Sequence, residues 1–341
     1  MKKLSFIDKI IYFLNIVVAT VLLLSYILPY VQPKNFSLLS VLSLAVPILI
    51  LINAIFLLYW LLKVKKQLLV SLIVLLLGYN YVISLYKFSS SKAKETESTI
   101  SIMNYNVRLF NIYNWIDQPN IEIDIVNMIT EKNPDIVCFQ EYHPHKNLNL
   151  LLYSYKYEKL AGKNLKYGQA IYSKYPIINK GSVGFPNSAN NAIFIDIATK
   201  SDTLRIYNVH LQSSRIDANV ENLDSEKSEQ LLKSLKKTFA MQQSQAELFI
   251  VHKSKSPYKV IVAGDFNNTA YSYVYNEIRG NLKDAFEEAG NGFGRTFSFK
   301  YFPVRIDFIL VDKSFEVNSF KTIDKKLSDH YPIFSEVILH Q

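Results

Sequence analysis

The chain has 341 residues, enough for more than one folded unit, and a formal net charge of +9 with 49% hydrophobic residues. Residues 1–98 carry ten lysines and three acidic residues, a net charge of +7, which leaves about +2 for residues 99–341. This distribution excludes a strongly basic soluble domain of the kind that binds DNA without sequence preference, but not a local basic patch. The single cysteine, Cys138, excludes an intramolecular disulfide.

Three apolar stretches without charged residues occupy the N-terminal part of the chain, at about 10–31, 38–62 and 68–86. Each is about as long as a helix that crosses a bilayer. A cleavable signal peptide is disfavoured, because no small-residue cleavage site follows the first stretch and two further apolar stretches come after it. We therefore expect residues 1–88 to form a membrane anchor of three transmembrane helices, which makes the chain a multi-pass membrane protein.

The lysines between these stretches predict the orientation of the anchor. Three lysines precede the first stretch and three lie within 63–66, whereas only Lys34 lies between the first and second stretches. Positively charged flanks tend to stay in the cytoplasm, so we expect the N-terminus and the 63–66 loop there. Three crossings then place everything after residue 90 outside the cytoplasm, although three lysines within 87–94 argue the other way.

A layered α/β domain is expected to follow the anchor. Residues 89–98, SSSKAKETES, are small and polar and predict a linker. From residue 99 to 341, apolar runs of strand length alternate with helix-length segments at 121–132, 221–251 and 271–279. The runs that predict strands are TISIMNYNV, DIVCFQE, YGQAIYS, AIFIDIA, TLRIYNVHL, KVIVAGDF, RIDFILV and PIFSEVIL.

Polar residues end or interrupt several of these apolar runs. A carboxylate at the end of a buried strand costs free energy unless it is paired, hydrogen-bonded or bound to a metal. Each residue alone has an ordinary structural alternative, such as an Asx turn in GDFNN, but together they predict a shared site. The residues are Asn106, Glu141, His210, Asp265, Asn267, Asp307, Asp329 and His330.

Seven short motifs resemble, in the same order along the chain, those of the endonuclease/exonuclease/phosphatase superfamily. That superfamily includes pancreatic deoxyribonuclease, abasic-site endonucleases, neutral sphingomyelinases and inositol-polyphosphate phosphatases. The resemblance covers about residues 99–341 and implies a four-layered α/β/β/α sandwich with the active site at one end. The motifs are NYNVR (104–108), PDIVCFQE (134–141), YGQAIYSKYPI (167–177), NVHL (208–211), GDFN (264–267), RIDFIL (305–310) and SDH (328–330).

The resemblance also implies a metal site built from hard oxygen ligands. Glu141 would be the principal ligand of Mg²⁺ or Mn²⁺, which suits a carboxylate. Asn106 would help to position the metal or the phosphate, and Asp329 would complete the metal's ligands. Whether the site holds one metal or two stays open.

The remaining motif residues are candidates for the chemistry on phosphorus. The resemblance implies that Asp307 and His330 form a carboxylate–histidine pair, in which the acid fixes the tautomer of the ring. Asp265 is the other candidate for orienting or deprotonating water, and the choice between His330 and Asp265 as general base stays open. Asn267 and His210 can donate hydrogen bonds to phosphoryl oxygens that gain charge.

One residue departs from the pattern of a particular subfamily. Abasic-site endonucleases typically carry an acidic or amide residue two positions after the motif asparagine, where this chain has Arg108. A cation there removes a possible second metal ligand and disfavours that repair specificity.

The main hypothesis is therefore an extracytoplasmic, membrane-anchored metal-dependent phosphoesterase that uses magnesium-assisted attack of water. Its substrate would be a phosphate ester, namely a lipid head group, a nucleotide or a nucleic acid, with small or lipid esters ranked above duplex DNA. The alternatives are an extracytoplasmic nuclease acting on DNA or RNA and a non-catalytic membrane-tethered binding module. The sequence leaves the natural substrate, the choice between diesterase, phosphatase and nuclease, and the oligomeric state open.

Overall fold

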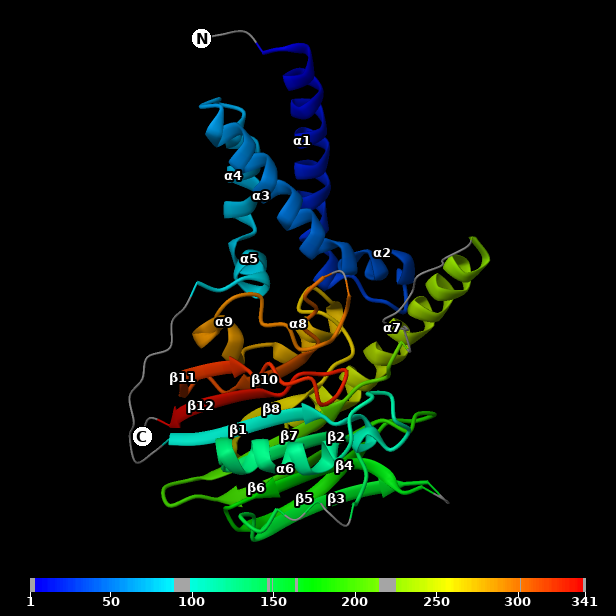
Figure 1. Ribbon diagram of the computed structural model, residues 1–341, viewed down its shortest axis with the longest axis vertical. Coiled ribbons are helices and arrows are strands. Elements are labelled where there is room, and N and C mark those ends of the chain that lie inside the picture. Colours follow the sequence, from blue (N-terminus) through cyan, green and yellow to red (C-terminus); the bar gives the residue numbers. More distant parts are fainter. Residues whose placement is uncertain are drawn as a thin grey trace.

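The computed structural model describes residues 4–88, 99–145, 148, 150–162, 165–214, 225–300 and 302–339. An apolar helical part stands on an α/β part that contains two sheets (Figure 1). The linker expected at 89–98 lies outside the described residues, as do the first four residues of the helix expected at 221–251.

The helical part contains two runs that are long and apolar enough to cross a membrane, Phe6–Tyr30 and Ser37–Leu62. The third stretch expected to cross the membrane, 68–86, is bent by 84° at Gly78, and it counts as a third span only if both its halves are taken together. The elements are α1 (Phe6–Ser25), η1 (Leu28–Tyr30), α2 (Ser37–Val41), η2 (Leu42–Ala45), α3 (Val46–Leu62), α4 (Leu68–Leu77) and α5 (Tyr79–Leu85).

Close packing at the bend requires glycine at position 78. A Cβ atom on Gly78 would lie 2.0 Å from the hydroxyl oxygen of Tyr26, so only glycine lets the Tyr26 ring lie at this point. The Tyr26 hydroxyl donates a hydrogen bond at 2.9 Å to the carbonyl oxygen of Val74, which also accepts from the backbone amide of Gly78 at 3.0 Å. The ring of Tyr26 also stacks on Tyr81 of α5, with centroids 4.7 Å apart.

Polar side chains join the helices on the inside, while apolar side chains cover the outside. Asn15 of α1 donates to the Ser71 hydroxyl at 2.6 Å and accepts a hydrogen bond from the Trp60 indole at 3.1 Å. The Ser71 hydroxyl donates to Asn53 at 3.2 Å, so α1, α3 and α4 share one buried network. Large apolar side chains point outward, including Phe6 with 78% of its surface exposed. Contact of such an apolar surface with water is unfavourable, and the hydrocarbon interior of a bilayer would remove that contact.

The first sheet has six strands and begins the α/β part. Strands β1 and β2 are parallel, and the other neighbours are antiparallel. In spatial order the strands are β11 (Phe315–Thr322), β12 (Ile333–Leu339), β1 (Thr99–Asn106), β2 (Ile136–Tyr142), β4 (Tyr167–Ser173) and β3 (Tyr155–Ala161).

The second sheet also has six strands and the same arrangement at its centre. Here β7 and β8 are parallel and the other neighbours are antiparallel. In spatial order the strands are β5 (Ile177–Gly184), β6 (Asn191–Ala198), β7 (Thr203–His210), β8 (Lys259–Asp265), β10 (Asp307–Val311) and β9 (Lys283–Asp284).

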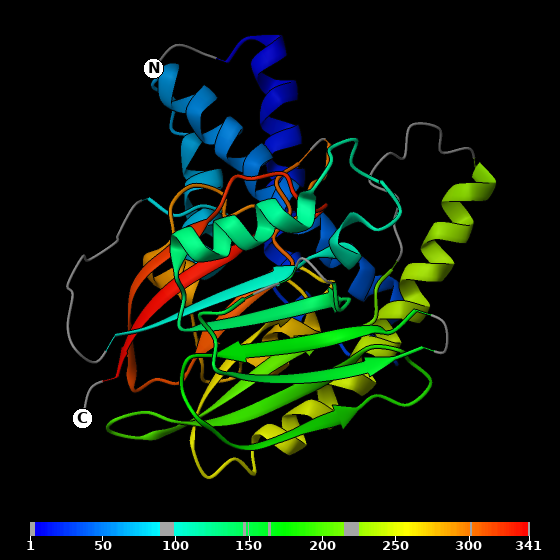
Figure 2. The ribbon, with the colours of Figure 1, turned by 60° about the horizontal axis from the view of Figure 1, so that its bottom comes forward.

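The two sheets pack face to face with helices outside them, which confirms the predicted four-layered sandwich. A core of buried aliphatic side chains from both sheets fills the space between them. The helix α6 (Ile121–Lys132) covers the outer face of the first sheet, and α7 (Ser225–Lys253) and α8 (Tyr273–Arg279) cover that of the second. Figure 2 shows α6 in front of the strands and α7 running behind them. The short elements η3 (Arg108–Asn111) and α9 (Ala285–Ala289) complete the order.

The helical part is joined to the sandwich by a buried ionic network. The Arg305 guanidinium donates to Asp284 at 2.6 Å and to the backbone carbonyl of Ser84, in α5, at 3.2 Å. The Ser84 hydroxyl donates to Glu287, which also pairs with Arg279 at 2.6 Å. Breaking a buried pair of this kind costs several kcal/mol, so the network fixes α5 against the sandwich.

Candidate active site at the ends of the central strands

The predicted site residues meet at one end of the sandwich because of the strand directions. Asn106 ends β1 and Glu141 lies near the end of β2, and these two strands are parallel. His210 ends β7 and Asp265 ends the parallel strand β8, where the two residues lie opposite each other. Asp307 begins the antiparallel strand β10 and lies opposite Asp265 on its other side.

A hydrogen bond between the sheets joins these two groups of residues. The Asn106 side-chain amide donates to Asp265 Oδ2 at 3.0 Å and lies 3.5 Å from Glu141 Oε1. Glu141 has a φ of 47°, a left-handed conformation that a non-glycine residue adopts only when its surroundings enforce it. This strain accompanies an irregularity in the pairing of β2 with β4 between Phe139 and Tyr142.

His330 and Asp307 form the second part of the site. The Nδ1 atom of His330 lies 2.9 Å from Asp307 Oδ2, and its Nε2 atom lies 3.7 Å from Asp265 Oδ2. The Thr296 hydroxyl oxygen accepts hydrogen bonds from the backbone amides of Ile306 and Asp307, which fixes the start of β10. His330 thus presents one ring nitrogen to each of two buried carboxylates.

The site contains polar atoms that could bind a metal ion or a substrate. Ligand atoms of Asp265, Asp307 and His330 all lie within 4.8 Å of one another, so this buried group could bind a metal. Two buried atoms, Asp307 Oδ1 and His210 Nε2, have no hydrogen-bond partner within the described part of the chain. Buried polar atoms without partners cost free energy, and they are common where a ligand supplies the missing contact. The carboxylates of Glu141, Asp265 and Asp307 offer the hard oxygen ligands that divalent cations prefer.

Burial and neighbouring charges set the protonation states. Burial raises the pKa of Asp265 to about 7, against the opposing effect of the His330 charge. Burial lowers the pKa of His330, but the carboxylates of Asp307 and Asp265 outweigh it and raise that pKa to about 10. Burial, together with the His330 charge, lowers the pKa of His210 to about 3. At neutral pH His210 is therefore neutral and His330 is charged.

Asn267 lies beside Asp265 and orients it. Its backbone amide donates to Asp265 Oδ1 at 2.8 Å, and its side-chain amide lies 3.3 Å from Asp265 Oδ2 and 3.0 Å from the carbonyl oxygen of Leu211. The φ of Asn267 is 50°, a left-handed conformation that asparagine tolerates better than most residues.

Asp329 has a partner that the sequence did not indicate. Arg108 Nη1 lies 3.0 Å from Asp329 Oδ2, and the Arg108 guanidinium stacks over Trp115 with 4.5 Å to the ring centroid. Asp329 lies at the mouth of the site, where Arg108, Glu141, Asn267 and His330 line the same cleft. The structure thus brings all eight predicted residues to one end of the sandwich.

A buried amide network behind the site also escaped prediction. Gln140, the residue before Glu141, donates to Asn104 at 2.7 Å and to Asn208 at 2.6 Å, which links the first sheet to the second. The Gln169 amide donates to the Asn208 carbonyl at 3.1 Å. The sequence does contain a sign of this network, because several of the apolar runs carry an asparagine or glutamine in their interior. A buried amide without a hydrogen-bond partner costs free energy, so such amides are expected to pair with one another.

Comparison with known proteins identifies the fold family. A family model described as Endonuclease/Exonuclease/phosphatase family matches residues 103–330, more than half of the chain. A second model, described as Domain of unknown function (DUF8431), matches residues 8–85. No curated protein is similar enough to the chain to count as a match.

Solved structures have the same fold. An endonuclease/exonuclease/phosphatase family protein from Bacteroides thetaiotaomicron is 18% identical, with a TM-score of 0.56 over 72% of this chain and 100% of that one. A protein of the same description from Bacteroides vulgatus is 22% identical, with a TM-score of 0.55 over 72% and 100%. The human Nocturnin catalytic domain with a bound sulfate anion is 16% identical, with a TM-score of 0.55 over 73% and 96%.

Members of this family are hydrolases that act on phosphoester bonds, and they usually use divalent metals. The match extends over all the strand ends that meet at the site. The chain belongs to the endonuclease/exonuclease/phosphatase family.

Proposed function

We propose that this protein is a membrane-anchored phosphoesterase that hydrolyses phosphodiester or phosphomonoester bonds by magnesium-assisted attack of water. The observation that carries this proposal is the convergence of two strand-end groups, one from each sheet. Asn106 and Glu141 from the first sheet lie against Asp265 from the second, and Asp307 and His330 complete the group. Carboxylates gathered in a buried site require a cation or an exchangeable proton to offset their repulsion.

The residues present fit a divalent cation. Glu141 would be the principal ligand of Mg²⁺ or Mn²⁺, with Asn106 beside it and Asp329 at the edge of the site. When bound, the ion would neutralise negative charge on the phosphoryl oxygens. The Arg108–Asp329 ion pair holds Asp329 at this edge and competes with the cation for its carboxylate.

The His330–Asp307 pair would stabilise the charge that develops on phosphorus-bound oxygen. Because Asp307 accepts from Nδ1, the other ring nitrogen faces Asp265 and the site. The two carboxylates favour the charged imidazolium, which is a strong hydrogen-bond donor to an oxyanion. A histidine held in the charged form is a poor base, and this favours the phosphate-binding role for His330.

Asp265 is then the better candidate for orienting and deprotonating the attacking water. Burial raises its pKa towards neutrality, which suits a general base at neutral pH. Asn106 and Asn267 donate hydrogen bonds to its carboxylate and fix its orientation. Neutral His210, 3.8 Å from the same carboxylate, has an Nε2 atom available to a phosphoryl oxygen.

The apolar helices would anchor the sandwich in a bilayer with the active site outside the cytoplasm. The lysine distribution supports this orientation. The start of α1 and the loop between α3 and α4 lie at the same end of the helical part, opposite the sandwich (Figure 1). That arrangement agrees with a sandwich and a lysine-rich loop on different sides of one membrane.

The test is hydrolysis by the purified full chain in detergent with Mg²⁺. The substrates are bis-p-nitrophenyl phosphate, plasmid DNA, a choline-containing sphingolipid and p-nitrophenyl phosphate, so that three classes of phosphodiester and one phosphomonoester are compared. We expect hydrolysis of at least one substrate, and a strong loss in Asp265→Asn and in His330→Ala. Activity on none of the four, or activity undiminished in both variants, would refute the proposal.

A further inference from the structure

A large cleft runs from the active site to the apolar helices. Its volume is about 1030 Å³, at the upper end of the range for sites that enclose a small molecule. Glu141, Asn267, Asp329 and His330 line one end. The catalytic end is therefore only a small part of a much longer cavity.

One wall of the cleft comes from the segment that would cross the membrane. Leu44, Pro47 and Ile48 line the cavity and lie at the junction of η2 with α3. These residues lie near the start of the apolar run Ser37–Leu62, at the end that adjoins the sandwich. The cleft therefore begins where the membrane-spanning part of the chain meets the catalytic part.

The opposite wall is also apolar. Leu231, Leu235 and Phe239 of α7 face the cavity at helical spacing. Phe299 and Phe302, from the segment before β10, line it as well. Binding of a hydrocarbon chain between such walls is favourable, because it removes apolar surface from water.

The positively charged side chains in the lining are paired with carboxylates. Arg305 is buried in its pair with Asp284, and Arg108 is paired with Asp329. His330 is held by Asp307. Within the described part of the lining, each cation thus already has a carboxylate partner, and the cleft lacks the free positive charges that bind a nucleic acid backbone.

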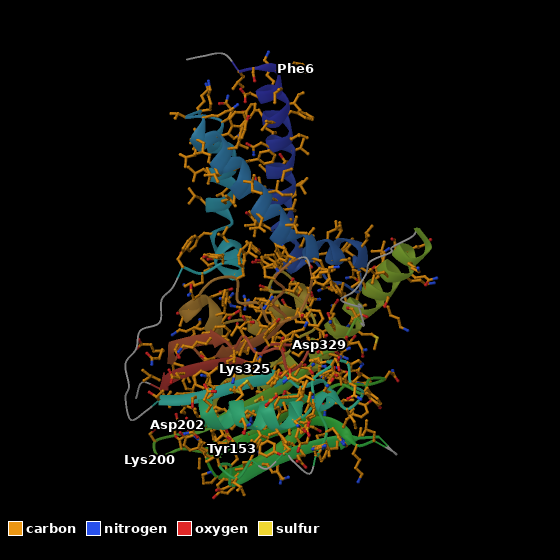
Figure 3. The ribbon with its side chains drawn as sticks, in the orientation of Figure 1. Phe6, Tyr153, Lys200, Asp202, Lys325 and Asp329 are labelled. Carbon is orange, nitrogen blue, oxygen red and sulfur yellow. The ribbon has the colours of Figure 1, made fainter. Side chains whose placement is uncertain are left out.

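The location of the site agrees with access from a bilayer. Figure 3 shows Asp329 in the upper part of the sandwich, nearer the apolar helices than Tyr153, Lys200 and Asp202. The mouth of the active site is thus on the membrane side of the catalytic part, where a lipid could enter without leaving the bilayer surface entirely.

We propose that the substrate is a membrane lipid phosphoester whose phosphate enters the site at Glu141 and His330 while its hydrocarbon chain lies between α3 and α7. This inference rests on the proposed function and specifies its substrate class. A free nucleotide or sugar phosphate could use the catalytic end but would leave the apolar walls in contact with water. A single molecule with a phosphate head and an apolar tail satisfies both ends of the cleft.

Two synthetic diesters with the same reacting group test the tail-binding role directly. These are p-nitrophenyl methyl phosphate and p-nitrophenyl dodecyl phosphate, assayed with Mg²⁺ and the full chain in phosphatidylcholine vesicles. The measured quantity is the ratio of kcat/KM for the dodecyl ester to that for the methyl ester. Both esters are hydrolysed by the same chain in the same preparation, so the ratio is independent of the fraction that is folded.

Substitutions in the cleft should lower this ratio. We expect Leu231→Arg, which places a charge against the tail, to reduce it at least about tenfold, the effect of losing contact with a few methylene groups. Ile48→Gln on the opposite wall should reduce it in the same direction. Leu248→Arg is the matched control, because Leu248 lies on the same helix with 42% of its surface exposed and does not line the cleft. It should leave the ratio unchanged.

The outcomes separate the two proposals. If the wild-type chain hydrolyses the methyl ester but shows no preference for the dodecyl ester, the lipid inference fails and the phosphoesterase proposal stands. The same holds if Leu231→Arg and Ile48→Gln both keep the wild-type ratio, because the preference would then come only from partitioning into the vesicle. If the chain hydrolyses neither diester but does hydrolyse the monoester p-nitrophenyl phosphate, the lipid inference fails and the phosphoesterase proposal stands. If none of the three is hydrolysed, the proposed function fails and the inference falls with it.

Discussion

Replacing Asp307 with asparagine removes one charge from the centre of the site and keeps the size of the side chain. His330 Nδ1 lies 2.9 Å from Asp307 Oδ2, and both side chains are almost fully buried. Without this carboxylate the ring loses the partner that orients it and favours its charged form, and losing one hydrogen-bond donor to a developing oxyanion lowers kcat by about 100- to 1000-fold. Asp265 remains close to the ring, so we take the lower value and expect kcat to fall about 100-fold.

The pH dependence gives a second measurement on the same variant. Asp307 raises the pKa of His330, so the charged ring persists in the wild type well above neutral pH. In Asp307→Asn that pKa falls, and activity that needs the charged ring is lost at a lower pH as the solution becomes more alkaline. The alkaline limb of the rate profile should therefore move towards neutrality.

The matched control is Asp324→Asn, the same chemical change at a carboxylate that is 85% exposed and is paired with Arg295. It should keep both the wild-type rate and the wild-type pH profile, because an exposed pair contributes little. The assay is hydrolysis of bis-p-nitrophenyl phosphate with Mg²⁺ between acidic and alkaline pH. An Asp307→Asn rate within a factor of about three of the wild type would refute the role given to the pair.

Three further predictions concern stability and topology. Asp284→Asn should lower the free energy of unfolding by about 3 kcal/mol, because it leaves Arg305 buried without its carboxylate; an unchanged melting temperature in detergent would contradict this. Gln140→Leu should destabilise the sandwich by about 1 to 3 kcal/mol by removing the amide that donates to Asn104, and chemical denaturation that shows no loss would refute it. A cysteine at Lys65→Cys should react with a membrane-impermeant maleimide only after cells are permeabilised, whereas one appended at the C-terminus should react in intact cells; the reverse pattern would overturn the orientation.

The central strands were predictable because they are buried on both faces. The eight predicted apolar runs correspond to the interior strands of the two sheets, such as β1 and β7, whose residues are almost all buried. The four strands that escaped prediction, β3, β5, β9 and β11, are the four edges of the two sheets. The edge strand β5 has no fully buried residue, so its sequence lacks the apolar run that marks an interior strand.

The prediction of the apolar helices shows a similar limit. Length and composition indicate the helices, but they do not report the bend at Gly78, where the ring of Tyr26, the residue that follows α1, packs against the glycine. Ordinary glycine in a helix carries only a modest penalty, so the residue alone does not predict an 84° bend.

The candidate site was predictable from short motifs because its residues stand at strand ends, where an apolar run stops abruptly at a polar side chain. Asp265 and Asp307 could be named in this way without a structure. The pairing of Arg108 with Asp329 could not, because more than two hundred residues separate the two in sequence and only the packing of the sandwich brings them together. The cleft between α3 and α7 likewise arises from the docking of two parts of the chain.

The most direct test of the central claim is the metal dependence of hydrolysis at Glu141. The full chain is assayed with bis-p-nitrophenyl phosphate after treatment with EDTA, and again after Mg²⁺ is restored. We predict loss and recovery of activity in the wild type, and no recovery in Glu141→Gln, because the amide cannot supply the charged oxygen ligand. Full activity in EDTA, or equal recovery in Glu141→Gln, would contradict a metal-dependent phosphoesterase at this site.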